Sequence, residues 1–229
     1  MAGILYGIGV GPGEPDLMTI KAVKTIRSCD IIAVPGADYR ESVAYNIALG
    51  AVEELKDRKT VVGMPMPMTK DRQVLDENYR KTAHQIEAWL DEGKNVGFLT
   101  LGDVTIYSTY LYVHRMVTED GYRTEIINGI PSFCAVASRL NTGLVERSEE
   151  LHVIPASYQV EDALKLSGTK ILMKAGRQLG RVKEQLKAAK ADVVMVENCG
   201  MDGEQVYRGV EEMQEDAGYY SLMIVRSKA

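Results

Sequence analysis

The sequence predicts an α/β protein whose first part holds a mainly parallel sheet. Short apolar runs such as Ile4 to Val10 and Ile31 to Val34 alternate with helical stretches along the chain, and buried strands in such units are typical of parallel sheets. The 229 residues suit one large domain or two domains of about 110 residues each. The composition, with 45% hydrophobic residues, is that of a folded protein.

The opening segment is predicted to be a βαβ unit. The apolar run that starts at Ile4 leads into a glycine-rich turn, and a helix with Asp16 as its candidate N-cap follows. Four apolar positions recur about every third residue, which predicts one helix face against a sheet. These positions are Leu17, Ile20, Val23 and Ile26.

The next segments continue the alternation. A helix is predicted over 41–55, a strand over 60–62 and another strand over 96–100. The Met-Pro stretch over 64–68 is incompatible with regular helix and predicts a loop. A long helix follows the loop, and its apolar stripe consists of Tyr79, Ala83, Ile86 and Leu90.

A domain boundary is expected after the next helix, which covers about 105–119. Asp120-Gly121 interrupts the chain there, and a strand over 124–127 leads into a second turn. The predicted domains are therefore 1–120 and 121–229. In the second domain, strands are predicted over 151–154, 170–173, 193–197 and 220–225, and one helix aligns Leu179, Val182 and Leu186.

Charge and cysteine usage narrow the functional classes. The net charge is −5 and the pI is about 5.4, whereas nucleic-acid binders need clustered Lys and Arg, so no nucleic-acid partner is expected. No apolar run approaches the roughly 20 residues of a membrane span, and the start has no basic stretch, which predicts a cytoplasmic protein. The three cysteines and three histidines show no metal-site spacing. We expect buried thiols and no bound metal.

The first candidate site is the glycine-rich turn over residues 7–13. It fails the dinucleotide pattern Gly-x-Gly-x-x-Gly, because Pro12 and Glu14 stand where the last glycine would be. Pro12 also lacks an N–H for a phosphate, and no Gly-Lys-Ser/Thr follows. The turn therefore favours a neutral or cationic cofactor. The alternative is a tight turn whose glycines only allow close packing.

Three further turns follow predicted strands, where open α/β sheets bind ligands. The segment 99–109 presents Asp103 and then hydroxyl and aromatic side chains, although Asp103 is also a candidate helix N-cap. The segment 129–132 presents Ser132, and the segment 197–203 follows a later strand. Each turn alone indicates little.

Taken in order, these turns resemble the tetrapyrrole methylase family over essentially the whole chain. Val10-Gly11-Pro12-Gly13 is similar to the family's glycine loop, Leu101-Gly102-Asp103 to its Gly-Gly-Asp-Pro motif, and Gly129-Ile130-Pro131-Ser132 to its Pro-Gly-Ile-Thr turn. Leu101 and Val104 depart from the second motif. Four segments resemble one branch of the family, the C20-methyltransferases that act on precorrin-2 or cobalt-factor II. These segments are residues 98–109, Met66-Pro67-Met68, Ile154-Pro155-Ala156-Ser157 and Tyr219-Tyr220-Ser221-Leu222.

The resemblance implies two α/β domains that face each other across a cleft, the first with a mainly parallel sheet and the second with a mixed sheet. It also implies a homodimer, a role in cobalamin biosynthesis, and S-adenosylmethionine bound between the domains. Ala175 stands where relatives commonly have a larger residue, so its backbone is the expected contact. The implied cofactor contacts are Pro12, Leu101, Gly102, Asp103, Ile106, Pro131, Ser132, Ala175 and Cys199.

The implied reaction is displacement at the sulfonium methyl group by an electron-rich meso carbon, which requires in-line placement of the reactants. Tyr107 and Tyr220 are candidate catalytic residues, because each has a polar tip in a matching segment near a strand end. The alternative for both is packing with a satisfied hydroxyl. The candidates for binding macrocycle carboxylates, or else solvated cations, are Arg40, Lys70, Arg72 and Arg147.

Other functions stay open at this point. A sister methylase of the same fold would act on another macrocycle carbon, on a modified histidine as in diphthine synthesis, or on RNA ribose, which the acidic pI disfavours. A nucleotide-binding module without catalysis would bind phosphate ligands and not S-adenosylmethionine. No motif distinguishes precorrin-2 from cobalt-factor II as the substrate.

Overall fold

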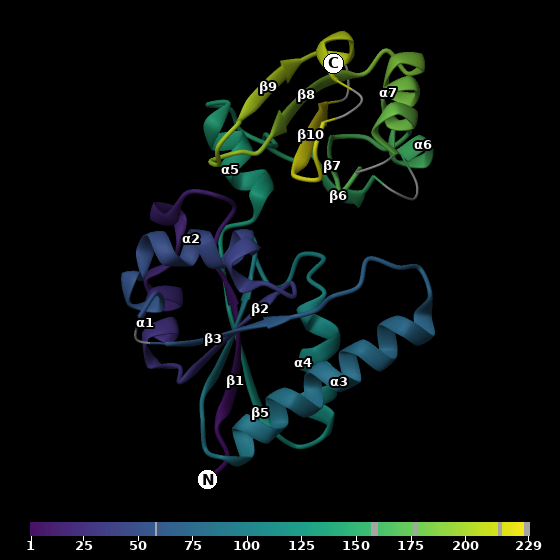
Figure 1. The fold of residues 1–229 in the computed structure, drawn as a ribbon. Coiled ribbons are helices and arrows are strands. Elements are labelled where there is room, and N and C mark those ends of the chain that lie inside the picture. The colour runs from purple at the N-terminus through teal and green to yellow at the C-terminus, as the bar shows by residue number, and fades with distance from the viewer. Residues whose placement is uncertain (58, 157–159, 176–177, 215–216, 227–229) are drawn as a thin grey trace. The chain divides into compact units, whose positions relative to one another are not determined.

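In the computed structural model, the described residues are 1–57, 59–156, 160–175, 178–214 and 217–226. The chain divides into two compact units, Met1–Pro131 and Ser132–Ala229 (Figure 1). The division falls later than the predicted end of the first domain at residue 120, because strand β5 (Arg123–Ile127) pairs with β1 (Ile4–Gly9) in the first sheet. The expected boundary is corrected accordingly.

The first unit is built on a five-stranded sheet in the order β3-β2-β4-β1-β5. Every pairing in it is parallel, so the predicted parallel sheet is confirmed. Besides β1 and β5, its strands are β2 (Ile31–Pro35), β3 (Thr60–Met64) and β4 (Val96–Thr100). β3 continues past its predicted end and takes Met64 from the Met-Pro stretch, whereas residues 65–69 form the expected loop.

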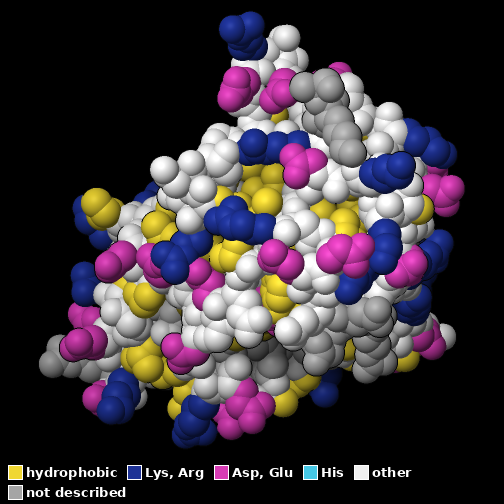
Figure 2. Space-filling view, turned by 90° about the horizontal axis from the view of Figure 1, so that it is seen from above, with side chains coloured by type: hydrophobic (Ala, Val, Ile, Leu, Met, Phe, Trp, Pro, Cys, Tyr) yellow, Lys and Arg dark blue, Asp and Glu magenta, His cyan; other side chains and the backbone are white. Residues whose placement is uncertain are grey.

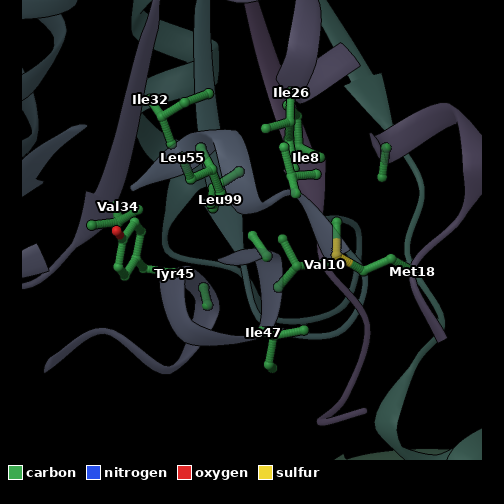
Figure 3. Close-up of a cluster of buried hydrophobic side chains, with 14 of the residues drawn as sticks. Ile8, Val10, Met18, Ile26, Ile32, Val34, Tyr45, Ile47, Leu55 and Leu99 are labelled. Carbon is green, nitrogen blue, oxygen red and sulfur yellow. The ribbon is translucent and has the colours of Figure 1, made fainter. Parts of the chain in front are cut away.

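Helices cover both faces of this sheet (Figure 1). One face carries α1 (Ile20–Ser28) and α2 (Val43–Ala51), and the other carries α3 (Arg72–Asp91) and α4 (Tyr110–Glu119). Alternate strand residues point to opposite faces, so Ile8 packs with α1 and α2 whereas Leu5 packs with α3 and α4. Figure 3 shows the first of these two cores, in which Ile26 and Ile47 supply the helix side.

The start of α1 differs from the prediction. Thr19 is the N-cap, and its hydroxyl oxygen accepts a hydrogen bond from Ala22 N at 3.1 Å. Asp16 lies in a preceding 3-10 turn and does not cap the helix. The helix therefore begins later than the apolar spacing suggested, with Ala22 and Ile26 buried and Ile20 74% exposed.

Two other helices are shorter than expected, whereas one is confirmed in full. α2 is flanked by 3-10 turns at Tyr39–Glu41 and Glu53–Leu55, which together span most of the predicted helix over 41–55. α4 begins at Tyr110 because residues 101–109 form a loop. The predicted stripe of α3 is buried at all four of its positions, Tyr79, Ala83, Ile86 and Leu90.

The second unit contains a mixed five-stranded sheet in the order β6-β7-β10-β8-β9. β6 and β7 are parallel, whereas β10 is antiparallel to β7 and β8, and β9 is antiparallel to β8. The mixed sheet is confirmed. Its strands are β6 (Leu151–Pro155), β7 (Thr169–Met173), β8 (Asp192–Glu197), β9 (Gln205–Arg208) and β10 (Ser221–Arg226).

The described residues of this unit include the helices α5 (Ser132–Arg139), α6 (Val160–Ala163) and α7 (Leu179–Ala188), with a 3-10 turn at Val210–Glu212. The predicted stripe of α7 is confirmed, because Leu179, Val182 and Leu186 are all buried. β9 escaped prediction because it is a short edge strand in which only Tyr207 is buried, so it lacks an apolar run.

The cysteines do not all follow the expected pattern. Cys29 is buried, and burial raises the pKa of its thiol to about 12. Cys134 is exposed on α5 and Cys199 is partly exposed in the turn after β8, so the expectation of three buried thiols is wrong for these two. Cys134 lies on α5 but is not among the buried residues of that helix, which are Phe133, Ala135, Val136 and Ala137. Cys199 lies in a turn.

No helix in the described part of the chain is long and apolar enough to cross a membrane. Figure 2 shows Lys and Arg side chains interspersed with Asp and Glu on one face of the molecule. Charges of both signs are thus mixed on this face.

Candidate functional site

The first three predicted turns lie side by side. The strands that precede them, β4, β1 and β5, are neighbours in one parallel sheet, so the three turns leave the same edge. Gly11 and Gly102 form an isolated bridge, with Gly11 N donating to Gly102 O at 3.2 Å and Gly102 N donating to Gly11 O at 2.8 Å. We name residues 10–14, 101–109 and 128–131 the first loop cluster.

Two glycines allow the backbones of this cluster to approach one another. A Cβ atom on Gly9 would stand 2.5 Å from Gly129 N and 2.7 Å from Gly102 O. A Cβ atom on Gly129 would likewise collide with Gly102 O. These partners are backbone atoms and cannot rotate away. The packing role considered for the glycine-rich turn is therefore real.

Asp103 ties the cluster together. Its Oδ1 accepts hydrogen bonds from Thr105 N, at 2.8 Å, and from the Thr105 hydroxyl. Its Oδ2 accepts from Gly129 N at 2.9 Å and from Asn128 Nδ2 at 3.2 Å. The carboxylate thus joins the loop after β4 to the loop after β5, and it does not cap α4, which begins at Tyr110.

These hydrogen bonds decide the charge of Asp103. The side chain is 5% exposed, and burial alone would raise the pKa of its carboxyl group. The hydrogen bonds from Thr105, Asn128 and Gly129 outweigh burial and hold the pKa below its ordinary value. The group is therefore a stable carboxylate with about four acceptor sites already used, which makes it an organiser of the loops.

The other predicted contacts of the first unit lie in the same three loops of this cluster. Pro12 and Gly102 are buried, whereas Leu101, Ile106 and Pro131 are half-buried. Ser132 begins α5 and belongs to the second unit. The cluster thus offers partly accessible apolar side chains around a buried polar centre.

The predicted contacts of the second unit also converge on one edge of its sheet. β7 and β8 run in the same direction on either side of β10, so their ends lie beside the start of β10. Asn198 N donates to Tyr220 O at 3.1 Å. This arrangement brings Ala175, which is 2% exposed, and Cys199 to the same edge as Tyr220. We name residues 174–175, 198–203 and 217–220 the second loop cluster.

Two glutamates order the second loop cluster, and sequence reasoning missed their roles. Glu197 accepts hydrogen bonds from Gly218 N and, at 3.1 Å, from the Tyr207 hydroxyl. Glu204 accepts from Gly200 N at 2.8 Å and pairs with Arg139. Glu197 is the first residue of the candidate turn over 197–203, but its partners Tyr207 and Gly218 come from other segments and leave no local signal.

The two candidate catalytic tyrosines lie on different units. Tyr107 is 41% exposed in the first loop cluster and adopts a left-handed backbone with φ of 51°. Tyr220 is 38% exposed and its ring meets that of Tyr219 edge to face, with 5.3 Å between centroids. Burial raises the pKa of Tyr220, so its hydroxyl is a hydrogen-bond donor at neutral pH far more readily than a base.

Three of the four candidate cations follow strands of the first sheet. Arg40 comes after β2, and Lys70 and Arg72 come after the Met-Pro loop that follows β3. All three are exposed, and Arg40 lies over the Tyr39 ring at 4.7 Å. They belong to the same sheet edge as the first loop cluster, because the sheet is parallel. Arg147 is exposed in the second unit.

Ser157, which ends one of the segments that resemble the C20-methyltransferase branch, lies outside the described residues. Among the residues that are described, no group of three or more His, Cys, Asp or Glu side chains is arranged to hold a metal ion.

The sequence matches the family described as Tetrapyrrole (Corrin/Porphyrin) Methylases over residues 4–213. Similar proteins include a probable cobalt-precorrin-2 C(20)-methyltransferase from Methanocaldococcus jannaschii, which is 32% identical over 97% of this chain and 95% of its own. The cobalt-precorrin-2 C(20)-methyltransferase of Salmonella typhimurium is 29% identical over 100% of this chain and 98% of its own. A precorrin-2 C(20)-methyltransferase from Sinorhizobium sp is 27% identical over 97% of this chain and 95% of its own.

Solved structures share the fold. A cobalt precorrin-4 methyltransferase has a TM-score of 0.77 at 18% identity, over 97% of this chain and 94% of its own. A uroporphyrin-III C-methyltransferase from Thermus thermophilus, solved with S-adenosylhomocysteine, has a TM-score of 0.69 at 15% identity, over 98% and 97% of the two chains. The two-unit architecture is therefore that of known methyltransferases.

Proposed function

Because the chain belongs to the tetrapyrrole (corrin/porphyrin) methylases, we propose that it methylates C20 of precorrin-2 or of its cobalt form in cobalamin biosynthesis, with S-adenosylmethionine as the methyl donor. The observation that carries the proposal is the full-length similarity to C20-methyltransferases, at 32% and 29% identity. Similarity of that extent covers both units and all four turns.

The first loop cluster fits this cofactor better than a nucleotide. A phosphate cradle needs free backbone N–H groups, but those of Gly11, Gly102 and Gly129 already donate within the cluster. Pro12 has none. S-adenosylmethionine carries no phosphate, and its adenosyl and methionine parts suit the half-buried side chains of the cluster. This disfavours the nucleotide-binding alternative.

We propose that the cofactor contacts the nine residues predicted from the sequence, with unequal roles. Asp103 acts as a positioning residue, since its oxygens already accept four hydrogen bonds. The apolar contacts come from half-buried side chains. The contacts are Pro12, Leu101, Gly102, Asp103, Ile106, Pro131, Ser132, Ala175 and Cys199.

Methyl transfer mainly requires the protein to align two reactants. When bound, the cofactor would supply an electrophilic methyl group. The meso carbon would give an electron pair to the new C–C bond as the C–S bond breaks, and the carbon would then lose its proton. This displacement requires in-line placement of the two reactants. We propose Tyr107 and Tyr220 as hydroxyl groups that contact the macrocycle near that proton, and Arg40, Lys70, Arg72 and Arg147 as partners for its carboxylates.

Calorimetry and product analysis test this function. We expect S-adenosylhomocysteine to bind in the micromolar range and ATP and NAD not to bind. We also expect a labelled methyl group to pass to precorrin-2, to its cobalt form, or to both. Tight binding of a nucleotide with no binding of S-adenosylhomocysteine would refute the proposal.

We further propose that the protein is a homodimer, as the family resemblance implies. Light scattering coupled to size exclusion measures the mass directly. A mass near the 25.3 kDa of a single chain would contradict the dimer.

A further inference from the structure

Lys174 has an unusual backbone conformation for its place in the fold. Two of the left-handed residues, Asn141 and Lys190, follow the ends of α5 and α7, where such a residue closes a helix. Lys174 instead follows the strand β7, with φ of 59°. The residues other than glycine with positive φ, among those described, are Tyr107, Asn141, Arg147, Lys174, Lys190 and Asn198.

The helix ends have hydrogen bonds that explain their conformation, as the bond from Ala191 N to Leu186 O at 3.0 Å does for Lys190. After β7 no helix ends, and a left-handed lysine is strained there. Strain of this kind is retained where the direction of a side chain matters. The conformation of Lys174 therefore points to a role for its side chain.

The surroundings of Lys174 suit a ligand that has both an anionic and a flat part. The side chain is half-buried, and burial lowers the pKa of its ammonium group. Met173 pairs with Leu222 of β10, so Lys174 lies next to the segment that enters β10. That segment presents the edge-to-face pair of Tyr219 and Tyr220, which are 46% and 38% exposed.

Burial disfavours the charged form of an ammonium group, and an anion bound beside the group favours that form. The aromatic pair in the neighbouring segment provides apolar area with polar tips. Lysine serves as a point charge for carboxylates. The second loop cluster therefore combines a cation with an aromatic surface, besides the predicted contacts Ala175 and Cys199.

We propose that Lys174 binds a carboxylate group of a reactant in methyl transfer, with Tyr219 and Tyr220 lining the same subsite. The inference rests on the proposed function, in which both reactants carry carboxylates. One source is the amino-acid part of the cofactor, and the other is an acetate or propionate of the macrocycle. Binding measurements separate the two sources.

The test uses the full chain with Lys174→Met, Lys174→Gly and Lys174→Arg. The glycine variant removes the cation and adopts the left-handed backbone without steric cost. Lys190→Met is the matched control, since Lys190 is an exposed lysine with φ of 48°. The probes are S-adenosylhomocysteine and 5′-methylthioadenosine, which lacks the carboxylate, together with KM for the macrocycle.

If the cofactor is the source, Lys174→Met and Lys174→Gly weaken S-adenosylhomocysteine binding at least tenfold and leave methylthioadenosine binding unchanged. If the macrocycle is the source, its KM rises at least tenfold and cofactor binding stays constant. In both cases Lys174→Arg retains most of the wild-type value and Lys190→Met all of it.

Unchanged binding and KM in both neutral variants overturn the proposal, and so does an equal loss for the two adenosyl probes. If the wild-type chain transfers the methyl group while the Lys174 variants match it, only this inference falls. If the wild-type chain neither binds S-adenosylhomocysteine nor transfers a methyl group, the proposed function falls and this inference falls with it.

Discussion

Replacement of Asp103 by asparagine perturbs the first loop cluster at its centre. The substitution preserves the shape of the side chain but turns one acceptor oxygen into an NH2 donor. The NH2 group would replace either Oδ1 or Oδ2, depending on the orientation of the amide. In the first case it would face the N–H and hydroxyl donors of Thr105. In the second case it would face the N–H donors of Gly129 and Asn128. A buried hydrogen-bonded centre becomes partly unsatisfied.

The expected loss follows from those two hydrogen bonds. At roughly 1.5 kcal/mol for each bond to a charged acceptor, the free energy of unfolding falls by about 3 kcal/mol. For a chain of this length that corresponds to a decrease in Tm of roughly 10 °C. Because the loops also lose their alignment, we expect S-adenosylhomocysteine affinity to fall with stability.

The effect of pH has a definite sign. The folded-state pKa of Asp103 is lowered, so its stabilisation is fully present above the unfolded pKa, near 4, and is lost as the pH falls through the lower folded value. The Tm difference between wild type and Asp103→Asn should therefore be constant from pH 8 to 5 and shrink below pH 4.

Thermal melts of the full chain across this pH range make the measurement. Asp38→Asn is the control, since Asp38 is an exposed carboxylate that accepts a hydrogen bond from Arg40 N at 2.9 Å. Asparagine caps such a turn as well as aspartate does, so its Tm should hardly change. An Asp103→Asn variant that melts within about 2 °C of wild type, or whose difference ignores pH, would refute this reasoning.

Three further predictions concern other sites. Gly9→Ala should abolish S-adenosylhomocysteine binding and lower Tm, because its Cβ atom would lie 2.5 Å from a backbone atom. Gly143→Ala is the control and should be neutral, because its Cβ atom would lie 3.8 Å from the nearest atom. Equal Tm values for the two variants would contradict this prediction. Burial and a neighbouring carboxyl group raise the pKa of Glu87, so its ionised form destabilises the fold above that pKa. Glu87→Gln should then stabilise the chain by roughly 0.5 kcal/mol at pH 7 and by less at pH 4, and a loss of Tm at pH 7 would count against it. Tyr107→Phe and Tyr220→Phe should each lower kcat about tenfold with unchanged S-adenosylhomocysteine affinity, and an unchanged kcat removes the proposed role.

Local patterns predicted the elements that carry continuous apolar signals. The stripe of α3 from Tyr79 to Leu90 and that of α7 from Leu179 to Leu186 are both buried as expected. The start of α1 was misplaced because Asp16 is by residue type a better N-cap than Thr19. Only packing, which buries Ala22 and exposes Ile20, distinguishes the two starts.

The candidate turns were found from sequence order, but their connections were not. Asp103 meets Asn128 and Gly129 across sequence separations of 25 and 26 residues, and that contact depends on β1 lying between β4 and β5. Strand order is a non-local property, so no turn reports it alone. The same holds for Glu197 and Gly218 in the second unit.

The proposed methylation of C20 can be located on the product. The most direct measurement incubates the protein with ¹³C-methyl-labelled S-adenosylmethionine and either precorrin-2 or its cobalt form, and then locates the new methyl carbon by NMR. We expect a single labelled methyl group on C20 of at least one of these macrocycles. Label on another carbon, or on neither macrocycle, would contradict it.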